Sequence, residues 1–93
     1  MWMYKISNIF TDEEINKIFS GHLDLVNDKI SFILQIIEKL EGSYNNSGIR
    51  NWFFRPRQLL NNVSPFEIFI NKWNPKDDKS KNILELLNIG DAT

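Results

Sequence analysis

The chain contains no cysteine in its 93 residues. This absence excludes disulfide bonds, thiolate metal ligands and cysteine nucleophiles within the chain. Small secreted domains usually need such cross-links, because a chain of this length buries only about 60–65% of the surface that its unfolded form exposes. We therefore expect the protein to act in a reducing compartment, the cytoplasm.

Histidine and glycine are also scarce. The single histidine, His22, follows Gly21 in a short turn, where nothing in the sequence fixes a partner for acid–base chemistry. One histidine and no cysteine would leave mainly carboxylates to bind zinc, which is poor zinc chemistry. The four glycines, at positions 21, 42, 48 and 90, are too far apart for a phosphate-binding loop. We predict no catalytic residue, no metal site and no cofactor, and so a protein that is not an enzyme.

Two further absences argue against a membrane or a nucleic acid as the partner. No apolar run approaches the ~20 residues that span a bilayer, and the first ten residues lack the basic leader and apolar run of a signal peptide. The formal net charge is −1, whereas a dedicated nucleic-acid binder normally carries a basic excess. The only local basic cluster is Arg50, Arg55 and Arg57, which we interpret as surface charge and helix capping.

What the chain does contain is a series of helix signals. The sharpest are two capping boxes, in which a Ser or Thr and a Glu three residues later bond each other's backbone N–H groups. Thr11 and Glu14 form the first box. Ser64 and Glu67 form the second, with Pro65 at the first helical position, where its missing N–H has no cost. Both boxes predict a helix that starts at a defined residue.

Apolar residues spaced by three and four positions predict the remaining helices. The expected helices cover residues 12–20, 27 or 28 to 41, 47–55, 64–73 and 77 or 78 to 89, with a short turn or helix at Leu59-Leu60. The only strand candidate is Met1 to Ile9, where Trp2, Tyr4 and Ile6 alternate. The predicted fold class is all-α, a small bundle of four to five short helices. Residues 1–26 are expected to form an arm and a short capped helix, and residues 27–93 the main helical domain.

Large apolar side chains outnumber what a core of this size is expected to hold. In Trp52-Phe53-Phe54, successive side chains point about 100° apart on a helix, so at least one ring faces away from the core. Two interpretations are open: that ring packs under the N-terminal arm, or it anchors a protein interface, where Trp, Tyr and Arg are favoured. The candidate partner-binding residues in this region are Trp52, Phe54, Arg55, Arg57 and Trp73.

Several short motifs also follow one another in a familiar order. They are Arg50-Asn51-Trp52, Pro56, Leu59-Leu60-Asn61-Asn62, Ser64-Pro65-Phe66-Glu67 and Leu86-Leu87-Asn88-Ile89-Gly90-Asp91. With them, residues 29 to 93 resemble the C-terminal toxin-binding domain of Xre/MbcA/ParS-type bacterial antitoxins. Asn61-Asn62 stands where that family usually has a glycine turn, and Asn is the residue other than glycine that best tolerates a left-handed conformation.

The resemblance implies an all-helical domain that binds a RES-type toxin, an enzyme that consumes or transfers from NAD, and neutralises it by covering its active-site cleft. It assigns the contact to the final helix and to the tail residues Gly90, Asp91, Ala92 and Thr93. Family members usually carry a helix-turn-helix DNA reader ahead of this domain. Only 28 residues precede it here, too few for a reader of several helices.

Two other functions are compatible with the sequence. The first is a stand-alone helical interaction or oligomerisation module, either a homodimer or, for example, a phage-encoded inhibitor with a different protein partner. The second is a DNA-associated regulator that uses Arg50, Arg55 and Arg57, against which the net charge argues.

Overall fold

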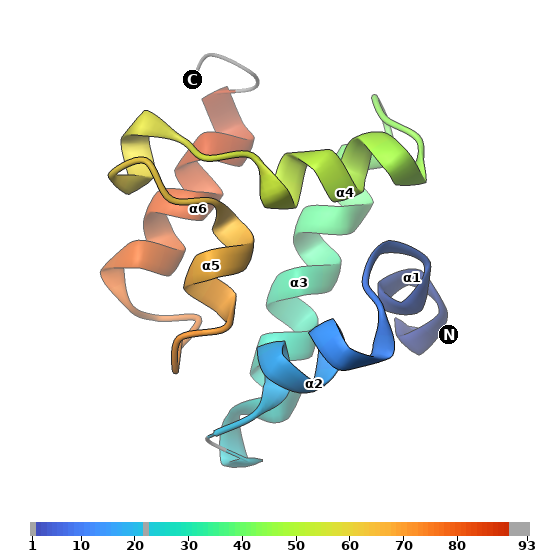
Figure 1. The fold of residues 1–93 in the computed structure, drawn as a ribbon, viewed down its shortest axis with the longest axis vertical. Coiled ribbons are helices and arrows are strands. Elements are labelled where there is room, and N and C mark those ends of the chain that lie inside the picture. Colours follow the sequence, from blue (N-terminus) through green and yellow to red (C-terminus); the bar gives the residue numbers. More distant parts are fainter. Residues whose placement is uncertain (1, 22, 90–93) are drawn as a thin grey trace.

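The helices of the chain are shown in Figure 1, a computed structural model that describes residues 2–21 and 23–89. The α-helices within these residues are α1 (Trp2–Ile9), α2 (Asp12–Phe19), α3 (Val26–Leu40), α4 (Asn46–Phe54), α5 (Pro65–Phe69) and α6 (Asp78–Ile89). Two 3-10 helices lie between them, η1 (Leu23–Leu25) and η2 (Gln58–Leu60). No strand occurs in this part of the chain, where Arg57 and Val63 form an isolated backbone bridge. The predicted all-α fold class is confirmed.

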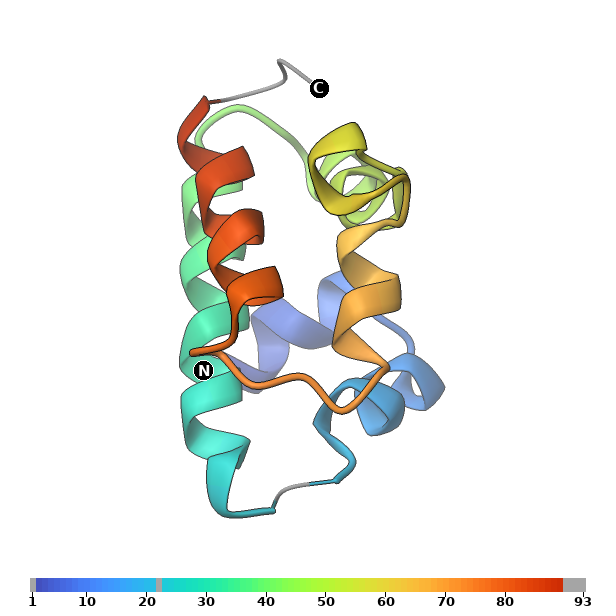
Figure 2. The ribbon, with the colours of Figure 1, turned by 90° about the vertical axis from the view of Figure 1, so that its left-hand side faces the viewer.

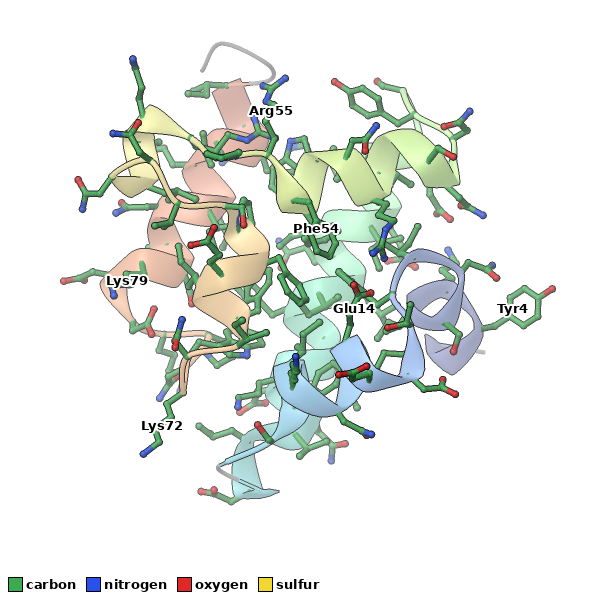
Figure 3. The ribbon with its side chains drawn as sticks, viewed as in Figure 1. Tyr4, Glu14, Phe54, Arg55, Lys72 and Lys79 are labelled. Carbon is green, nitrogen blue, oxygen red and sulfur yellow. The ribbon has the colours of Figure 1, made fainter. Side chains whose placement is uncertain are left out.

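Residues 2–9 form helix α1, so the strand predicted at this end of the chain is wrong. The buried side chains Ile6, Ile9 and Phe10 are spaced by three and four residues, as on one face of a helix. Tyr4 and Ile6 would share a face of a strand, but Tyr4 is 71% exposed and points away from the body in Figure 3, whereas Ile6 is completely buried. Packing of α1 against α3 and α4 decides the outcome, because a short helix gains most of its stability from such contacts.

The start of α2 follows the sequence prediction. The Glu14 N–H donates to Oγ1 of Thr11 at 3.2 Å, and the Thr11 N–H donates to Oε1 of Glu14 at 2.8 Å. Both halves of the capping box are therefore formed. Gly21 follows the helix with φ at 99°, a left-handed backbone conformation that glycine adopts without steric cost.

Helix α3 is the longest helix among the described residues and lines the core along its length. Its fully buried side chains include Ile33, Ile36 and Ile37, whereas Ile30 and Leu34 of the predicted apolar face are only half-buried. The buried face is thus rotated slightly from the predicted one. At 15 residues, α3 is also shorter than the ~20 residues that cross a bilayer, and none of the described helices is long and apolar enough to do so.

The helices form two layers around one core. Figure 2 shows α3 and α6 side by side, with α4, α5 and α2 on the opposite side of the core. α3 and α6 run in the same direction, from the bottom to the top of Figure 1. α1 packs against both α3 and α4 and closes one edge. The buried apolar cluster includes Ile6 and Ile18 as well as side chains from α3 to α6, so residues 1–26 and residues 27–93 share this core.

Aromatic rings run through the centre of the core. Phe53 of α4 packs against Phe10 and Phe69, with ring centroids 5.0 Å and 6.0 Å apart. Phe69 packs in turn against Trp73 at 4.6 Å, and Trp73 against Phe32 at 5.5 Å. These separations are typical of favourable aromatic pairs. The rings therefore connect α1, α3, α4 and α5 through one continuous set of contacts.

A charged contact fixes α2 against α4. Nη1 and Nη2 of Arg50 donate to the two carboxylate oxygens of Glu14, each at 2.8 Å, and Nη1 also donates to the Ile9 carbonyl at 2.8 Å. The guanidinium lies over the ring of Phe54, 4.4 Å from its centroid. Two-point pairing of this kind is stronger and more specific than a single contact. It holds the N-terminal helices in one position on the bundle.

Replacing Glu14 by Gln tests this contact, because Gln keeps a side-chain oxygen for the capping box and removes the charge. Hydrogen bonding from Arg50 lowers the pKa of Glu14 from 4.5 to about 2. A lowered pKa in the folded state adds stability above the unfolded pKa, and this stability is lost as the pH falls towards the folded value. We expect Glu14→Gln to lower the free energy of unfolding by about 1–2 kcal/mol at neutral pH, allowing for screening at Arg50, whose side chain is 40% exposed.

Urea unfolding of both proteins as a function of pH measures this effect, and the difference between them should shrink between about pH 5 and pH 2. Glu13→Gln is the matched control, since Glu13 is 82% exposed and lies 3.8 Å from Lys17 in a surface pair. That substitution should change the free energy of unfolding by less than about 0.5 kcal/mol. A Glu14→Gln difference that stays constant with pH would contradict the proposed role of the charge.

Candidate functional site

Trp52 and Phe54, two of the predicted partner-binding residues, lie at the inner end of α4. Trp52 is buried with 4% of its surface exposed, and Phe54 is half-buried. The Phe54 ring stacks on Phe66 at 4.3 Å and lies 6.2 Å from Phe10 of the N-terminal segment. Figure 3 shows Phe54 between α4 and α2, close to Glu14. Of the two interpretations of this ring, packing with the N-terminal segment is the one that the contacts support.

Arg55 and Arg57 lie just after α4 and have different environments. Arg55 is exposed, whereas Arg57 has only 1% of its surface exposed. The structure brings both together with Trp52 around a shallow hollow of about 190 Å³. The residues that line this hollow are Tyr44, Gly48, Asn51, Trp52, Arg55 and Arg57. The predicted arginines are therefore neighbours, although one of them is inside the protein.

Trp73 is the third predicted aromatic, and it is a core residue. Its surface is 1% exposed, and its indole Nε1 donates to the Ile18 carbonyl at 2.9 Å. In the folded chain, Trp52, Arg57 and Trp73 thus offer almost no side-chain surface to a partner. The predicted contact residues Gly90, Asp91, Ala92 and Thr93 lie outside the described residues.

Lys29 is buried beside Trp73, beneath the turn that joins α2 to α3. Its ammonium lies 5.4 Å from the centroid of the Trp73 ring and donates to the Ser20 carbonyl at 3.4 Å. Burial lowers the pKa of Lys29, and the nearby Asp24 carboxylate partly offsets this effect. The contacts of Lys29 are all with the framework, so we interpret it as a residue that closes the end of the core.

The loop from Arg57 to Val63 shapes the surface next to α6. Backbone bonds close it, because the Arg57 N–H donates to the Val63 carbonyl at 3.1 Å and the Asn62 N–H donates to the Arg57 carbonyl at 2.8 Å. The buried guanidinium attaches the loop to α4: Nη2 of Arg57 donates to the Trp52 carbonyl at 3.0 Å. Its Nε also donates to the Arg55 carbonyl at 3.3 Å. Arg57 therefore positions the loop that carries η2.

Asn61 and Asn62 both adopt the left-handed conformation, with φ at 60° and 66°. The expectation that asparagine tolerates this turn is confirmed. Two consecutive left-handed residues reverse the chain within the loop, so that η2 and the start of α5 lie next to each other. Ser64 then caps α5 by accepting a hydrogen bond from the Glu67 N–H at 3.2 Å, but the Glu67 side chain does not bond the Ser64 N–H in return, so only half of the predicted second capping box is formed.

Helix α5 is shorter than predicted, and the shortening creates the connector to α6. The helix ends at Phe69, where the Asn71 side-chain amide donates to the Glu67 carbonyl at 2.6 Å and takes the place of a further helical N–H. Lys72 then takes a left-handed φ of 49°. Asp77 begins α6 by accepting hydrogen bonds from the N–H groups of Asn74 at 3.1 Å and Ser80 at 2.8 Å.

Two adjoining hollows are lined by the 57–63 loop, α5, the connector after α5 and the start of α6. We call them together the α5/α6 groove. The larger hollow, of about 490 Å³, is lined by Val63, Glu67, Ile68, Asn71, Lys72, Trp73, Asp77, Asp78 and Lys79. The smaller hollow, of about 150 Å³, is lined by Leu59, Leu60, Asn61, Val63, Ile68, Lys79 and Asn82. Val63, Ile68 and Lys79 line both, so the hollows meet at these residues. Figure 2 shows the course of α5 and α6, the two helices that contribute lining residues to both hollows.

The groove has an apolar floor and a charged rim. Leu60, Val63 and Ile68 form the floor, and Leu59 at its edge is 40% exposed, one of the most exposed large apolar side chains in the described part of the chain. Figure 3 shows Lys79 beside the first turn of α6 and Lys72 pointing away from the body. Such a surface suits an apolar side chain of a partner surrounded by polar contacts.

Sequence reasoning did not select Leu59 or Lys79 as site residues. The available signals were weak: Leu59-Leu60 is a pair of large side chains in a turn too short to bury both, and Lys79 is a cation in the first turn of a helix. A carboxylate or histidine cluster for a metal ion is not formed by the described residues either.

Replacing Arg57 by Lys should detach the 57–63 loop from α4. Lysine keeps a positive charge but cannot donate to both carbonyls in the fixed geometry of a guanidinium. We expect a loss of about 2–3 kcal/mol in the free energy of unfolding, because buried carbonyls lose their partner. Faster hydrogen exchange at the backbone amides of residues 60–63 should accompany it, and unchanged exchange there would contradict the positioning role.

Replacing Lys72 by Gly should stabilise the fold by about 0.5–1 kcal/mol, because glycine adopts the positive φ of this position without the steric cost of a side chain. Lys72→Ala is the control, since alanine keeps the Cβ and should change the free energy of unfolding by less than about 0.5 kcal/mol. Thermal unfolding of the three proteins measures the difference. Equal stability of the Gly and Ala variants would show that Lys72 is not strained.

Comparison with known proteins does not assign this chain to a family. No protein-family model matches it, and no curated protein or solved structure shows significant similarity to it. The resemblance of residues 29 to 93 to the antitoxin domain therefore stays a prediction that depends on the short motifs of the sequence.

Proposed function

We propose that the protein is a protein-binding module whose docking surface is the α5/α6 groove. The observation that carries the proposal is Leu59, which is 40% exposed at the edge of a hollow that the half-buried Val63 also lines, with the buried Leu60 and Ile68 beneath. An apolar strip bordered by polar and charged side chains is the usual composition of a protein interface. The two hollows would hold side chains of the partner.

The charges of the rim favour a protein over a nucleic acid as the partner. Glu67, Asp77 and Asp78 line the larger hollow, where their carboxylates would repel a phosphate backbone. Lys72 and Lys79 lie on the same rim, so the surface carries both signs of charge. A protein segment with charges of both signs matches this surface, whereas a polyanion does not.

For the partner, we propose the one that the resemblance implies: a RES-type toxin, which this chain would neutralise in the cytoplasm by covering its active-site cleft. The geometry supports this proposal to the extent that α6, the helix to which the resemblance assigns the contact, forms one side of the groove. In this form the chain acts as a binding inhibitor and performs no reaction itself. A stand-alone interaction module with a different protein partner is the alternative, and the same groove would serve it.

Co-expression with RES-type toxins in a bacterial growth assay tests the proposal. The full chain should restore growth and co-purify with the toxin that it neutralises. Leu59→Asp should abolish both effects, because it places a charge at the edge of the apolar floor. Tyr4→Asp is the matched control, because Tyr4 is also a strongly exposed apolar side chain. It projects from α1 on the side of the molecule opposite Lys79 in Figure 3. Its replacement should leave growth restored.

Failure to bind or neutralise any toxin of the panel would remove the antitoxin form of the proposal. Loss of binding in Tyr4→Asp, with binding retained in Leu59→Asp, would show that the docking surface is not the groove. Circular dichroism of both variants checks that each keeps its helices. Sedimentation of the purified chain separately tests the homodimer alternative, which a monomer at high concentration would contradict.

A further inference from the structure

The charge at the smaller hollow indicates the chemistry of the segment that binds there. Among the described residues that line this hollow, Lys79 alone is charged, and the other walls are apolar side chains and the amides of Asn61 and Asn82. Resting on the function proposed above, we propose that the partner contributes an amphipathic segment in which one carboxylate lies beside an aliphatic side chain. One aliphatic side chain of this segment enters the smaller hollow, and a neighbouring carboxylate pairs with Lys79.

The size of the hollow sets the size of the group that enters it. Its volume is about 150 Å³, comparable to cavities that accept a single benzene molecule. Leu59, Leu60, Val63 and Ile68 contribute its apolar lining. The hollow is open to solvent, and its volume suits an apolar side chain of about the size of leucine, isoleucine or phenylalanine.

The position of Lys79 is not explained by the stability of its own helix. Asp77 caps α6 through the Ser80 N–H, and Lys79 thus lies in the first turn, where the helix dipole disfavours a cation. Lys79 also forms no ion pair with another described residue. The adjacent carboxylate of Asp77 is engaged by two backbone N–H groups at 3.1 Å and 2.8 Å. A cation that opposes its helix dipole at the edge of an apolar hollow is a site for an external carboxylate.

The surroundings of Lys79 favour a carboxylate on a peptide over a phosphate of a nucleic acid or a lipid surface. Glu67 and Asp78 line the adjoining larger hollow and would repel an extended row of phosphates. A nucleic-acid backbone also has no aliphatic side chain for the apolar lining of the smaller hollow. An amphipathic helix that lies along a groove supplies both groups from one face, because residues three and four apart are neighbours.

The test uses the full chain and three labelled synthetic peptides of about twelve residues, or three helical turns. Each has leucine along one face, and a single position three or four residues from the central leucine carries glutamate, glutamine or lysine. We expect the glutamate peptide to bind about fivefold more tightly than the glutamine peptide, and the lysine peptide to bind most weakly. The preference should fall as salt is raised. Fluorescence anisotropy measures the affinities.

Lys79→Glu should reverse the order, so that the lysine peptide binds at least about fivefold more tightly than the glutamate peptide. This variant is expected to fold, because Lys79 is exposed and a carboxylate is favourable in the first turn of a helix. Lys81→Glu is the matched control: it makes the same charge change on the same helix at a residue that lines neither hollow, and it should leave the order unchanged.

A reversed order in Lys79→Glu, with no reversal in Lys81→Glu, supports the inference. Equal binding of the three peptides, with loss of binding in Leu59→Asp, would overturn the role of Lys79 and leave the groove as a docking surface. Absence of binding by all three peptides at millimolar concentration would also overturn the inference. The growth assay with Leu59→Asp tests the proposed function independently of this result. Binding that is equally strong in the Lys79→Glu and Lys81→Glu variants would overturn it as well.

Discussion

The indole of Trp73 donates its hydrogen bond to the carbonyl of Ile18, 55 residues earlier in the chain, at 2.9 Å. Its ring packs at the same time against Phe32 of α3 and Phe69 of α5. The core needs this contact because a chain this small has few residues with which to bury a large apolar area. It also fixes the start of the α5–α6 connector, since Trp73 directly follows the left-handed Lys72. The groove therefore has its shape because one buried ring anchors the connector to the first half of the chain.

A second buried group, the Arg57 guanidinium, fixes the 57–63 loop, which forms another wall of the groove. It fixes the loop that carries Leu59 and Leu60 by donating to the carbonyls at the end of α4. A buried cation is costly unless hydrogen bonds satisfy it, so its use here indicates a surface that has to keep a defined form. Two departures from ordinary local preference lie in the same region: Lys72 has a left-handed backbone, and Lys79 stands in the first turn of α6, where the helix dipole disfavours a cation. Such departures are expected where function, and not the stability of the fold, selects the residue.

The sequence has many aromatic side chains and so suggested an aromatic binding surface, but the structure divides the apolar side chains between core and surface in another way. Most of the aromatic rings are used inside the core, where Trp52, Phe53 and Trp73 are buried. The surface that we assign to a partner is instead aliphatic, with Leu59 at its edge and charged side chains of both signs on its rim. A module built in this way holds its shape through rigid rings and offers a smaller, charge-selective contact to its partner.

Local chemistry was enough to predict the helix starts and the fold class. The capping box at Thr11 and Glu14 is formed as the sequence indicates, and Ser64 caps α5 with Pro65 at its first position, because these features depend on residues within one turn; the Glu67 half of the second box is not formed. The periodic apolar residues of α3 and α6 predicted helices to within two residues of their ends for the same reason. Tertiary contacts decided the rest. Helix α1 is too short to be stable alone and forms because it packs against α3 and α4, where Ile6 is buried. The burial of Arg57 and the proximity of Leu59 to Lys79 also depend on contacts between residues that are distant in the sequence. No local sequence pattern encodes such contacts.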